Sequence, residues 1–230
     1  EISNRANAIK KAIFDLKTGD ILMVAGKGHE INQEYKKIKK LFSDEREILK
    51  NIAIKNKTLS SNLKLNILKE LSNSNNISSK LEINNASINS KEIKKNNVFF
   101  AIRGENKDGN LFIKEALNKG ASLAIINNKK KSKKNEIVVK DTLKFLTEAS
   151  SILRENFPSK IISITGSCGK TSLKELTGRS LNKISQTTYS PKSFNNKFGV
   201  PLSLFNLKKD DDFGIFEIGM DKKGEIDYLS

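Results

Sequence analysis

The chain contains few of the features that define several large protein classes. It has one cysteine, so no disulfide can form within it. Its longest apolar runs, such as Ile21 to Ala25 and Val98 to Ile102, are about five residues, whereas a membrane span needs roughly 20. The N-terminus also lacks the basic start, apolar stretch and small-residue cleavage site of a signal peptide. These absences predict a cytoplasmic protein without a membrane span.

Arginine is scarce although the chain is strongly basic. The formal net charge is +16 at pH 7, but only five of the 42 basic residues are arginine, the residue best suited to bidentate contacts with phosphates and bases. The lysines are spread over every segment, and the lysine-rich run from Asn127 to Glu136 is typical of an exposed loop. The composition therefore favours a solvated lysine-rich surface over a nucleic-acid-binding one.

The apolar pattern predicts an α/β protein of three small or partial α/β domains, the first at residues 1–56. Apolar residues at helical spacing predict an amphipathic helix from Arg5 to Lys17. The wholly apolar run from Ile21 to Ala25 predicts a buried parallel strand. A further helix is expected from Ser43 to about Lys55, with Asp44 and Glu47 spaced as a capping pair. The polar stretch after it predicts a domain junction near residues 56–60.

Residues 57–157 and 158–230 are predicted to form the second domain and the first part of the third. Strands are expected at NVFFAI, SLAII and EIVV, helices at GNLFIKEALNKG and from Asp141 to about Asn156. In the third domain, KIISIT and FGIFEIG are expected as core strands around a helix from Lys170 to Leu181. This pattern indicates a parallel-sheet P-loop ATPase domain truncated at its C-terminus. Because the chain also begins at Glu1 rather than Met, we expect a fragment of a longer protein.

The stretch ITGSCGKTSLKE predicts a phosphate-binding loop. A strand runs into a glycine-rich turn and then a helix, so backbone N–H groups and the positive end of the helix point at one place. Lys170 would lie against the β and γ phosphates of a nucleotide, and the Thr171 hydroxyl would coordinate Mg²⁺. The alternative is a glycine-rich turn with a capping threonine. The candidate phosphate-binding residues of this Gly-x-x-Gly-Lys-Thr loop are Gly166, Ser167, Cys168, Gly169, Lys170, Thr171 and Ser172.

Glu217 is the candidate metal-binding carboxylate. It ends the apolar strand GIFEIG, and an acid at the carboxyl end of a core strand beside a phosphate loop is well placed to hold Mg²⁺. The alternative is a glutamate on the surface at a strand end. Lys170 and Glu217 are therefore the candidate catalytic residues, and Thr171 and Glu217 the candidate metal ligands.

Four stretches together resemble the Mur ligase family, over about Thr58 to Ser230. ITGSCGKTSLKELTGRSL, SFNNKFGVPLSLFNL and FGIFEIGMDKKGEI are similar to its central ATPase domain, and SINSKEIKKNNVFFAIRGENKDGNLFIKEALNKGASLAII to the N-terminal UDP-substrate domain of its MurF branch. The resemblance implies that ATP activates a carboxylate as an acyl phosphate, which an amine attacks. In that branch D-Ala-D-Ala is added to UDP-MurNAc-tripeptide during peptidoglycan synthesis. Asn195 or Asn196 is then expected near nucleotide and substrate; the alternative for both is a turn.

Two motifs depart from the family pattern. The family usually has Asp-Ser-Arg where this chain has Asn89-Ser90-Lys91, and often Asp-Gly-His where it has Asp108-Gly109-Asn110. Individual contacts with the UDP substrate are therefore not assigned to these residues.

The first 55 residues are similar to the end of the C-terminal domain of the MurE branch, which adds a diamino acid to UDP-MurNAc-L-Ala-D-Glu. In the GKGHE motif of that branch the first Gly and the Glu contact the diamino acid, which implies Gly26 and Glu30 here. A carboxylate there suits the distal ammonium of meso-diaminopimelate or lysine. His29 is expected to pack within the loop rather than act as a base. The chain thus resembles a MurE tail joined to a MurF head, and alone we expect it to perform neither ligation.

Two other interpretations remain open at this stage. One is an unrelated P-loop ATPase or kinase with a separate leader domain, which would transfer phosphate to a hydroxyl and leave GKGHE and FNNKFGVP without a role. The other is a basic RNA-binding protein with an incidental phosphate loop, although the sequence offers few arginines and lacks the stacking aromatics for it.

Overall fold

The structure is a computed structural model that describes residues 2–27, 30–35, 38–74, 77–104, 107–127, 134–220 and 223–229. The chain divides into two compact units, Glu1–Thr58 and Leu59–Ser230. Helix α2 (Asp44–Ser72) contributes residues to both units. Within the described ranges, no helix combines the length and apolar character that a membrane crossing requires.

The first unit is built from α1 (Arg5–Asp15), a hairpin of β1 (Asn32–Tyr35) and β2 (Ile38–Leu41), and the start of α2. Ile9 and Ile13 of α1 are buried, as the helical spacing predicts. The Lys55 ammonium donates to the carbonyls of Ile13 (2.8 Å) and Leu16 (2.7 Å). A cation on α2 thus satisfies carbonyls at the C-terminal end of α1, where the helix dipole also favours positive charge.

The predicted buried strand from Ile21 to Ala25 is wrong. The segment has no regular secondary structure, and the side chains of Ile21 and Met23 are 94% and 85% exposed. A strand needs a hydrogen-bonded neighbour, and within the described residues no strand pairs with this segment. An apolar run alone therefore did not determine a strand here.

The predicted capping pair at the start of α2 is also wrong. The Ser43 hydroxyl accepts a bond from the Arg46 N–H (3.4 Å), as an N-cap residue does. Asp44 instead accepts from the Arg5 Nε (2.8 Å) and Nη2 (2.6 Å). These hydrogen bonds lower the pKa of Asp44 from its ordinary value, and burial opposes that shift. Asp44 therefore links α1 to α2.

The stretch predicted as a polar junction near residues 56–60 is helical, because α2 continues without a break to Ser72, and the boundary between the two compact units, Thr58 to Leu59, falls within this stretch. Its hydroxyl residues bond to backbone groups of neighbouring segments rather than forming a turn. Ser61 Oγ accepts from the Ile83 N–H (2.8 Å), and Ser60 Oγ accepts from the Lys209 N–H (2.9 Å). Polar residues that are typical of a turn serve here to satisfy backbone groups of other segments.

The second unit contains a parallel sheet in the order β3-β4-β5-β6. Val98 and Phe100 face the main core, while Phe99 and Ala101 face a second cluster with α3, as the period of two requires. The expected strands at NVFFAI, SLAII and EIVV are confirmed. The elements are β3 (Ala86–Ser87), 3₁₀ helix η1 (Ser90–Glu92), β4 (Asn97–Phe100), 3₁₀ helix η2 (Gly109–Phe112), α3 (Ile113–Asn118), β5 (Ala121–Ile126), β6 (Glu136–Val138) and α4 (Thr142–Asn156).

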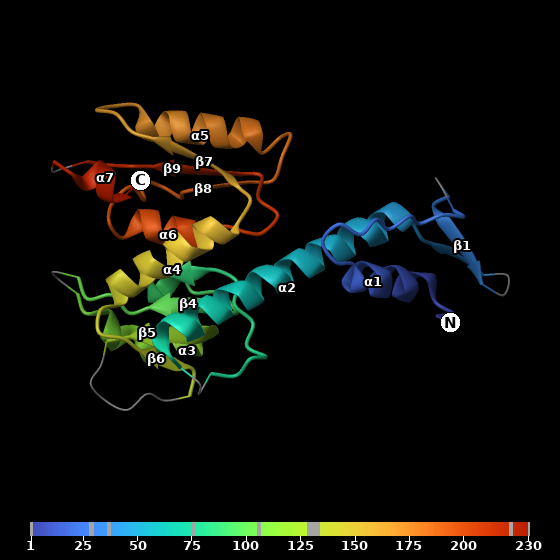
Figure 1. Cartoon of the computed structure of the whole chain (residues 1–230), viewed down its shortest axis with the longest axis horizontal. Helices are drawn as coiled ribbons and strands as arrows, with labels where there is room; N and C mark the ends of the chain where they lie inside the picture. The colour runs from blue at the N-terminus through green and yellow to red at the C-terminus, as the bar shows by residue number, and fades with distance from the viewer. Residues whose placement is uncertain are drawn as a thin grey trace. The chain divides into compact units, whose positions relative to one another are not determined.

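A second parallel sheet, in the order β7-β9-β8, follows in the same unit. Figure 1 shows α5 on one face of this sheet and α6 on the other. The expected strands at KIISIT and FGIFEIG and the helix between them are confirmed, whereas β8, α6 and α7 were not predicted. The elements are β7 (Lys160–Ile164), α5 (Lys170–Leu181), β8 (Thr187–Tyr189), α6 (Gly199–Phe205), β9 (Phe213–Glu217) and α7 (Glu225–Leu229).

Helices α4 and α6 form a layer between the two sheets (Figure 1). Side chains of both helices join both sheets in one hydrophobic core. Ser150 of α4 donates to the Pro201 carbonyl of α6 (2.7 Å). The Asn206 side chain accepts from the Ala86 N–H (2.6 Å) and donates to the Ala86 carbonyl (3.1 Å). The two sheets therefore share a core, and the boundary at residues 157 and 158 stays a prediction.

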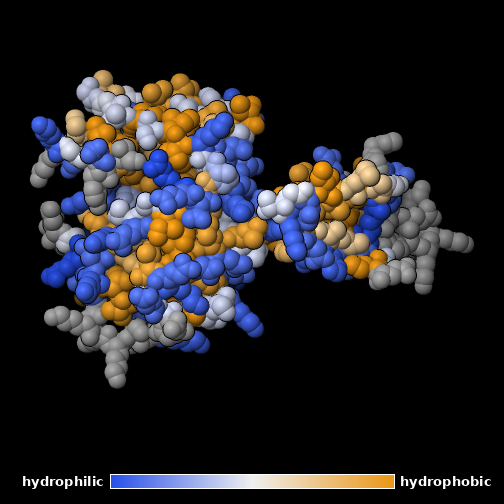
Figure 2. All heavy atoms as spheres, in the orientation of Figure 1, coloured by the Kyte–Doolittle hydropathy of each residue, from blue (hydrophilic) through white to orange (hydrophobic). Residues whose placement is uncertain are grey.

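The outer side of α5 exposes large apolar side chains. Leu173 and Leu176 are more than half exposed, and Ile184 just after the helix is more exposed still. Figure 2 shows hydrophobic residues over this helix. One helix thus covers the β7-β9-β8 sheet with one side and presents leucines to solvent with the other.

Candidate nucleotide-binding site

The predicted phosphate loop lies between the carboxyl end of β7 and the start of α5. Gly166 and Gly169 have φ of +151° and +76°, a region that favours glycine. Residues 165–169 are exposed, and Gly169 immediately precedes α5 without a side chain to cap it. The first N–H groups of α5 are therefore available to an anion. The Lys170 ammonium folds back to donate to the Gly166 carbonyl (2.7 Å).

Glu217 lies at the end of β9, the strand next to β7, and is 2% exposed. Its Oε2 accepts from the Thr171 hydroxyl (2.8 Å), and its Oε1 accepts from the Asn195 amide (2.8 Å). The structure thus brings together three of the predicted site residues, from the phosphate loop helix, β9 and the segment after β8. The alternative of a surface glutamate does not hold, because the side chain is buried.

The arrangement around Glu217 fits a Mg²⁺ ion held together with phosphates. Thr171 and Asn195 are uncharged partners, and a buried carboxylate is stabilised further by a nearby cation. Among the described residues, no cluster of three or more His, Cys, Asp or Glu could hold a metal. Mg²⁺ is commonly bound through one or two protein oxygens together with substrate phosphates and water. The Thr171 hydroxyl and the Glu217 carboxylate are the two oxygens that could serve.

The two candidate asparagines separate in the structure. Asn195 contacts Glu217, and its carbonyl accepts from the Gly219 N–H (2.7 Å). A Cβ at Gly219 would lie 3.0 Å from the Asn195 side chain, so the two segments approach closely there. Asn196 instead accepts from the N–H groups of Phe198 (3.1 Å) and Gly199 (3.0 Å) and caps α6. Asn195 therefore lies against the candidate metal-binding carboxylate, whereas Asn196 caps α6.

Sequence reasoning missed two residues beside the site. The Ser190 side chain is buried, and its hydroxyl accepts from the Glu217 N–H (3.4 Å). Lys174 of α5 is fully buried, although a lysine on an amphipathic helix is normally assigned to the surface. The one feature of the sequence nearby that indicates close packing of this helix is Gly178, because glycine is unfavourable inside a helix. A Cβ there would lie 2.7 Å from the Tyr189 ring, so close packing of α5 on β8 explains the glycine.

The two motifs that depart from the family pattern both cap short helices. Asn89 accepts from the Lys91 N–H (3.0 Å) at the start of η1. Asp108 accepts from the side chain (2.7 Å) and the backbone N–H (2.9 Å) of Asn110, and these bonds lower its pKa from the ordinary value. Asn110 also donates to Asn127 after β5 (2.6 Å). These residues follow the carboxyl ends of β3, β4 and β5, where parallel sheets bind ligands.

In the first unit, the two predicted contacts for a diamino acid lie in an exposed loop. Gly26 has φ +105°, which favours glycine. The Glu30 carboxylate pairs with the Lys27 ammonium at 3.2 Å, and that ammonium also donates to the Asn32 carbonyl (2.6 Å). Gly28 and His29, and with them the expected packing role of the histidine, lie outside the described residues.

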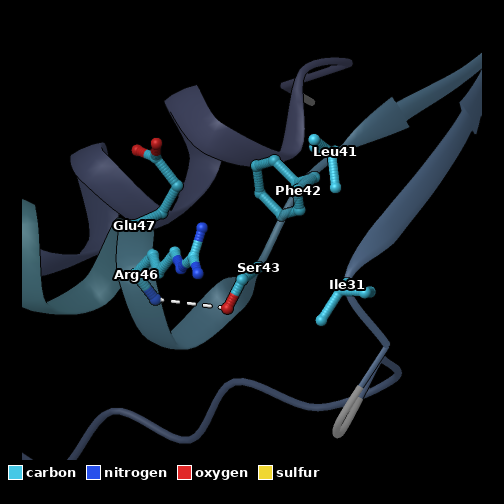
Figure 3. Close-up of a pocket in the computed structure, with 6 residues that line it drawn as sticks. All are labelled: Ile31, Leu41, Phe42, Ser43, Arg46 and Glu47. Atoms are coloured by element: carbon cyan, nitrogen blue, oxygen red, sulfur yellow. Dashed lines mark hydrogen bonds between the residues drawn. The ribbon is translucent and has the colours of Figure 1, made fainter.

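A pocket of about 190 Å³ lies next to this loop in sequence. Figure 3 shows its residues around the start of α2 and the adjoining ends of β1 and β2. Neither Gly26 nor Glu30 lines it, so the pocket does not bring the two predicted contacts together. It is lined by Ile31, Leu41, Phe42, Ser43, Arg46 and Glu47.

A phosphate loop between strand and helix, with a buried glutamate on the adjacent parallel strand, defines a P-loop nucleotide-binding α/β domain. Comparison with known families gives two matches. Residues 82–153 match the model of the Mur ligase family, catalytic domain, and residues 164–230 match that of the Mur ligase middle domain. The chain therefore belongs to the Mur ligase family.

Similar proteins are named UDP-N-acetylmuramoyl-tripeptide--D-alanyl-D-alanine ligase. The one from Buchnera aphidicola subsp. Acyrthosiphon pisum (strain APS) is 36% identical over 140 residues, which are 61% of this chain and 31% of that protein. The one from Escherichia coli (strain K12) is 33% identical over 129 residues, which are 56% of this chain and 28% of that protein. The chain thus spans about a third of the length of these relatives.

Solved structures of MurF enzymes share the fold. The ligase from Acinetobacter baumannii matches with a TM-score of 0.62 and 29% identity over 71% of this chain and 38% of that one. MurF from Thermotoga maritima, solved in complex with ADP, matches with a TM-score of 0.54 and 30% identity. That match covers 64% of this chain and 34% of the other.

Proposed function

We propose that this chain supplies the UDP-substrate domain and the phosphate-loop part of the ATPase domain of a ligase that adds D-Ala-D-Ala to UDP-MurNAc-tripeptide. The two Mur ligase domains and the names of the relatives support the proposal. The observation that carries it is the Glu217 carboxylate, buried beside the phosphate loop between Thr171 and Asn195. The site suits ATP with Mg²⁺.

When bound, ATP would supply the phosphoryl group that activates the carboxylate of the UDP-linked peptide, with ADP as the leaving group, and Mg²⁺ would offset the charge of the phosphates. The N–H groups of the loop and of the first turn of α5 orient the phosphates. Lys170, whose ammonium donates to the Gly166 carbonyl in this structure, would offset the charge that develops on the transferred group. Thr171 and Glu217 would hold the cation, and the Asn195 amide keeps the Glu217 carboxylate in place.

For the first unit, we propose the role that its motif implies, namely contact of Gly26 and Glu30 with meso-diaminopimelate or lysine in a MurE-type reaction. The side chain of Glu30 is 61% exposed and accessible to an ammonium group, for which Lys27 would compete. The fusion of a MurE-type tail with a MurF-type head and the cytoplasmic location stay predictions.

The test of the proposed function is the ligation itself. We expect the ligase that contains this chain to release phosphate from ATP only when UDP-MurNAc-tripeptide and D-Ala-D-Ala are both present, with the pentapeptide product seen by mass spectrometry. Phosphate transfer to a hydroxyl without an amide product would instead indicate a kinase. A parallel incubation with UDP-MurNAc-L-Ala-D-Glu and meso-diaminopimelate or lysine tests the MurE-type role, which the absence of tripeptide product would contradict.

A further inference from the structure

Lys174 is a buried charge that the proposed reaction does not use. It lies on α5 with none of its surface exposed. Its ammonium donates to the Lys192 carbonyl and lies 3.5 Å from a carboxylate oxygen of Glu175. A buried ammonium costs free energy unless its partners are well placed, so its contacts are tied to a specific arrangement of the surrounding chain.

The carbonyl that Lys174 holds belongs to the segment from Ser190 to Asn195. At one end of this segment, Ser190 Oγ accepts from the Glu217 N–H (3.4 Å); at the other, the Asn195 amide donates to the Glu217 carboxylate (2.8 Å). Between them, Lys192 has φ +51°, which is uncommon for a residue with a side chain. The ammonium thus binds the segment at its least favourable backbone position.

Lys174 also lies on the same helix as Thr171. Residues three apart share a helix face, so one face of α5 carries both the Thr171 hydroxyl, which contacts Glu217, and the Lys174 ammonium. One turn further on, Gly178 lets α5 approach the Tyr189 ring, directly before the segment. The helix that carries one partner of Glu217 is thereby fixed to the segment that carries the other.

We propose that Lys174 is a positioning residue that holds Asn195 against Glu217 and so shapes the carboxylate for Mg²⁺ with ATP. The inference rests on the proposed function, because it assigns Lys174 to the same nucleotide site. Lys174 acts through the Lys192 carbonyl and touches neither the nucleotide nor the cation. Without the ammonium, the segment from Ser190 to Asn195 is no longer held at Lys192. The Glu217 carboxylate then still accepts from Thr171, but the position of its second partner, the Asn195 amide, is no longer fixed.

The test is equilibrium binding of ATP to this chain, measured with Mg²⁺ and with EDTA. Lys174→Met keeps the length of the side chain and removes its charge. We expect about tenfold weaker binding with Mg²⁺, in line with the loss of a residue that orients a metal ligand, and unchanged binding in EDTA, where the loop alone acts. Lys183→Met, at an exposed lysine just after α5, is the matched control and should bind as the unsubstituted chain does.

A double-mutant cycle separates positioning from general stability. In an Asn195→Ala background, Lys174→Met should cause no further loss of Mg²⁺-dependent ATP binding, because the amide that Lys174 is proposed to position is already absent. The side-chain amide signal of Asn195 in an NMR spectrum without metal should shift in Lys174→Met and not in Lys183→Met. Equal weakening with Mg²⁺ and EDTA, additive losses in the cycle or an unmoved Asn195 signal would overturn the proposal.

Three further outcomes are informative. If Lys174→Met does not fold, Lys174→Arg keeps the charge but moves the donor, and it should shift the Asn195 signal and weaken only Mg²⁺-dependent binding; an unchanged variant would overturn the proposal. Absence of Mg²⁺-dependent ATP binding by the unsubstituted chain would instead refute the proposed function, and the inference with it. Normal Mg²⁺-dependent binding in Lys174→Met would refute the inference alone.

Discussion

Glu217→Gln is expected to abolish the Mg²⁺-dependent part of ATP binding and to stop ligation. Glutamine keeps the shape of the side chain and can still contact Thr171 and Asn195, but it removes the negative charge that would hold the cation. Lys170→Ala should bind ATP more weakly and lower kcat by about a hundredfold or more, because it removes the cation that faces the transferred phosphoryl group. Calorimetric titration of ATP with and without Mg²⁺, together with kcat of the ligase, measures both effects.

Glu155→Gln, at an exposed glutamate of α4, is the matched control and should leave both quantities unchanged. Near-normal turnover in either Glu217→Gln or Lys170→Ala would contradict the assignment of the site. Loss of ATP binding in EDTA for Glu217→Gln would point to a structural role for the carboxylate instead.

Lys64→Met is expected to remove a large pH dependence of stability. Lys64 of α2 is fully buried, donates to the Asn84 carbonyl (2.9 Å) and lies 5.4 Å from the centre of the Phe205 ring. Burial lowers its pKa to about 7, with Asp211 opposing the shift and Lys208 adding to it. Between about pH 7 and the ordinary lysine pKa, the unfolded chain therefore binds more protons than the folded one, and the free energy of unfolding rises with pH.

The expected rise is on the order of 4 kcal/mol for one group, since each pKa unit corresponds to about 1.4 kcal/mol. Denaturant unfolding at several pH values between 7 and 10 measures it for the unsubstituted chain and for Lys64→Met. Lys80→Met, at an exposed lysine, should retain the rise. If Lys64→Met shows the same pH dependence as the unsubstituted chain, the buried ammonium is not the group responsible.

The parts of the fold that sequence predicted well are those in which local pattern and tertiary contacts agree. The uninterrupted apolar run from Val98 to Ile102 fits a strand with a core on each face, and Asp141 caps α4 through the N–H groups of Leu143 and Lys144. The Gly-Lys-Thr loop was predicted from its glycines, and Gly166 and Gly169 have the positive φ angles that such a turn requires. In each case, a few neighbouring residues are enough to predict the element.

Prediction failed where a distant partner decides the outcome. Ser60 and Ser61 are typical of a turn, yet in α2 they accept hydrogen bonds from Lys209 and Ile83, which local sequence cannot reveal. The apolar run from Ile21 needed a paired strand to become one, and none of the described strands provides it.

The same distinction applies to the site. Glu217 and Asn195 were predicted from motifs, but only the fold distinguishes Asn195 on the carboxylate from Asn196 on the cap of α6. Lys174 could not be predicted at all, because its role depends on a backbone carbonyl 18 residues away. Backbone acceptors leave no mark in the sequence, so a buried lysine that bonds to one is indistinguishable from a surface lysine.

The position of the cation can be measured by binding ATP with Mn²⁺, a paramagnetic substitute for Mg²⁺, to the isotope-labelled chain. If Thr171 and Glu217 hold the cation beside the phosphate loop, the backbone amide signals of these residues and of Asn195 should broaden more than any others in the NMR spectrum. In the Glu217→Gln variant, these signals should remain sharp. Broadening centred elsewhere in the chain, or an equal effect of Mn²⁺ in the Glu217→Gln variant, would show that Thr171 and Glu217 do not hold the cation.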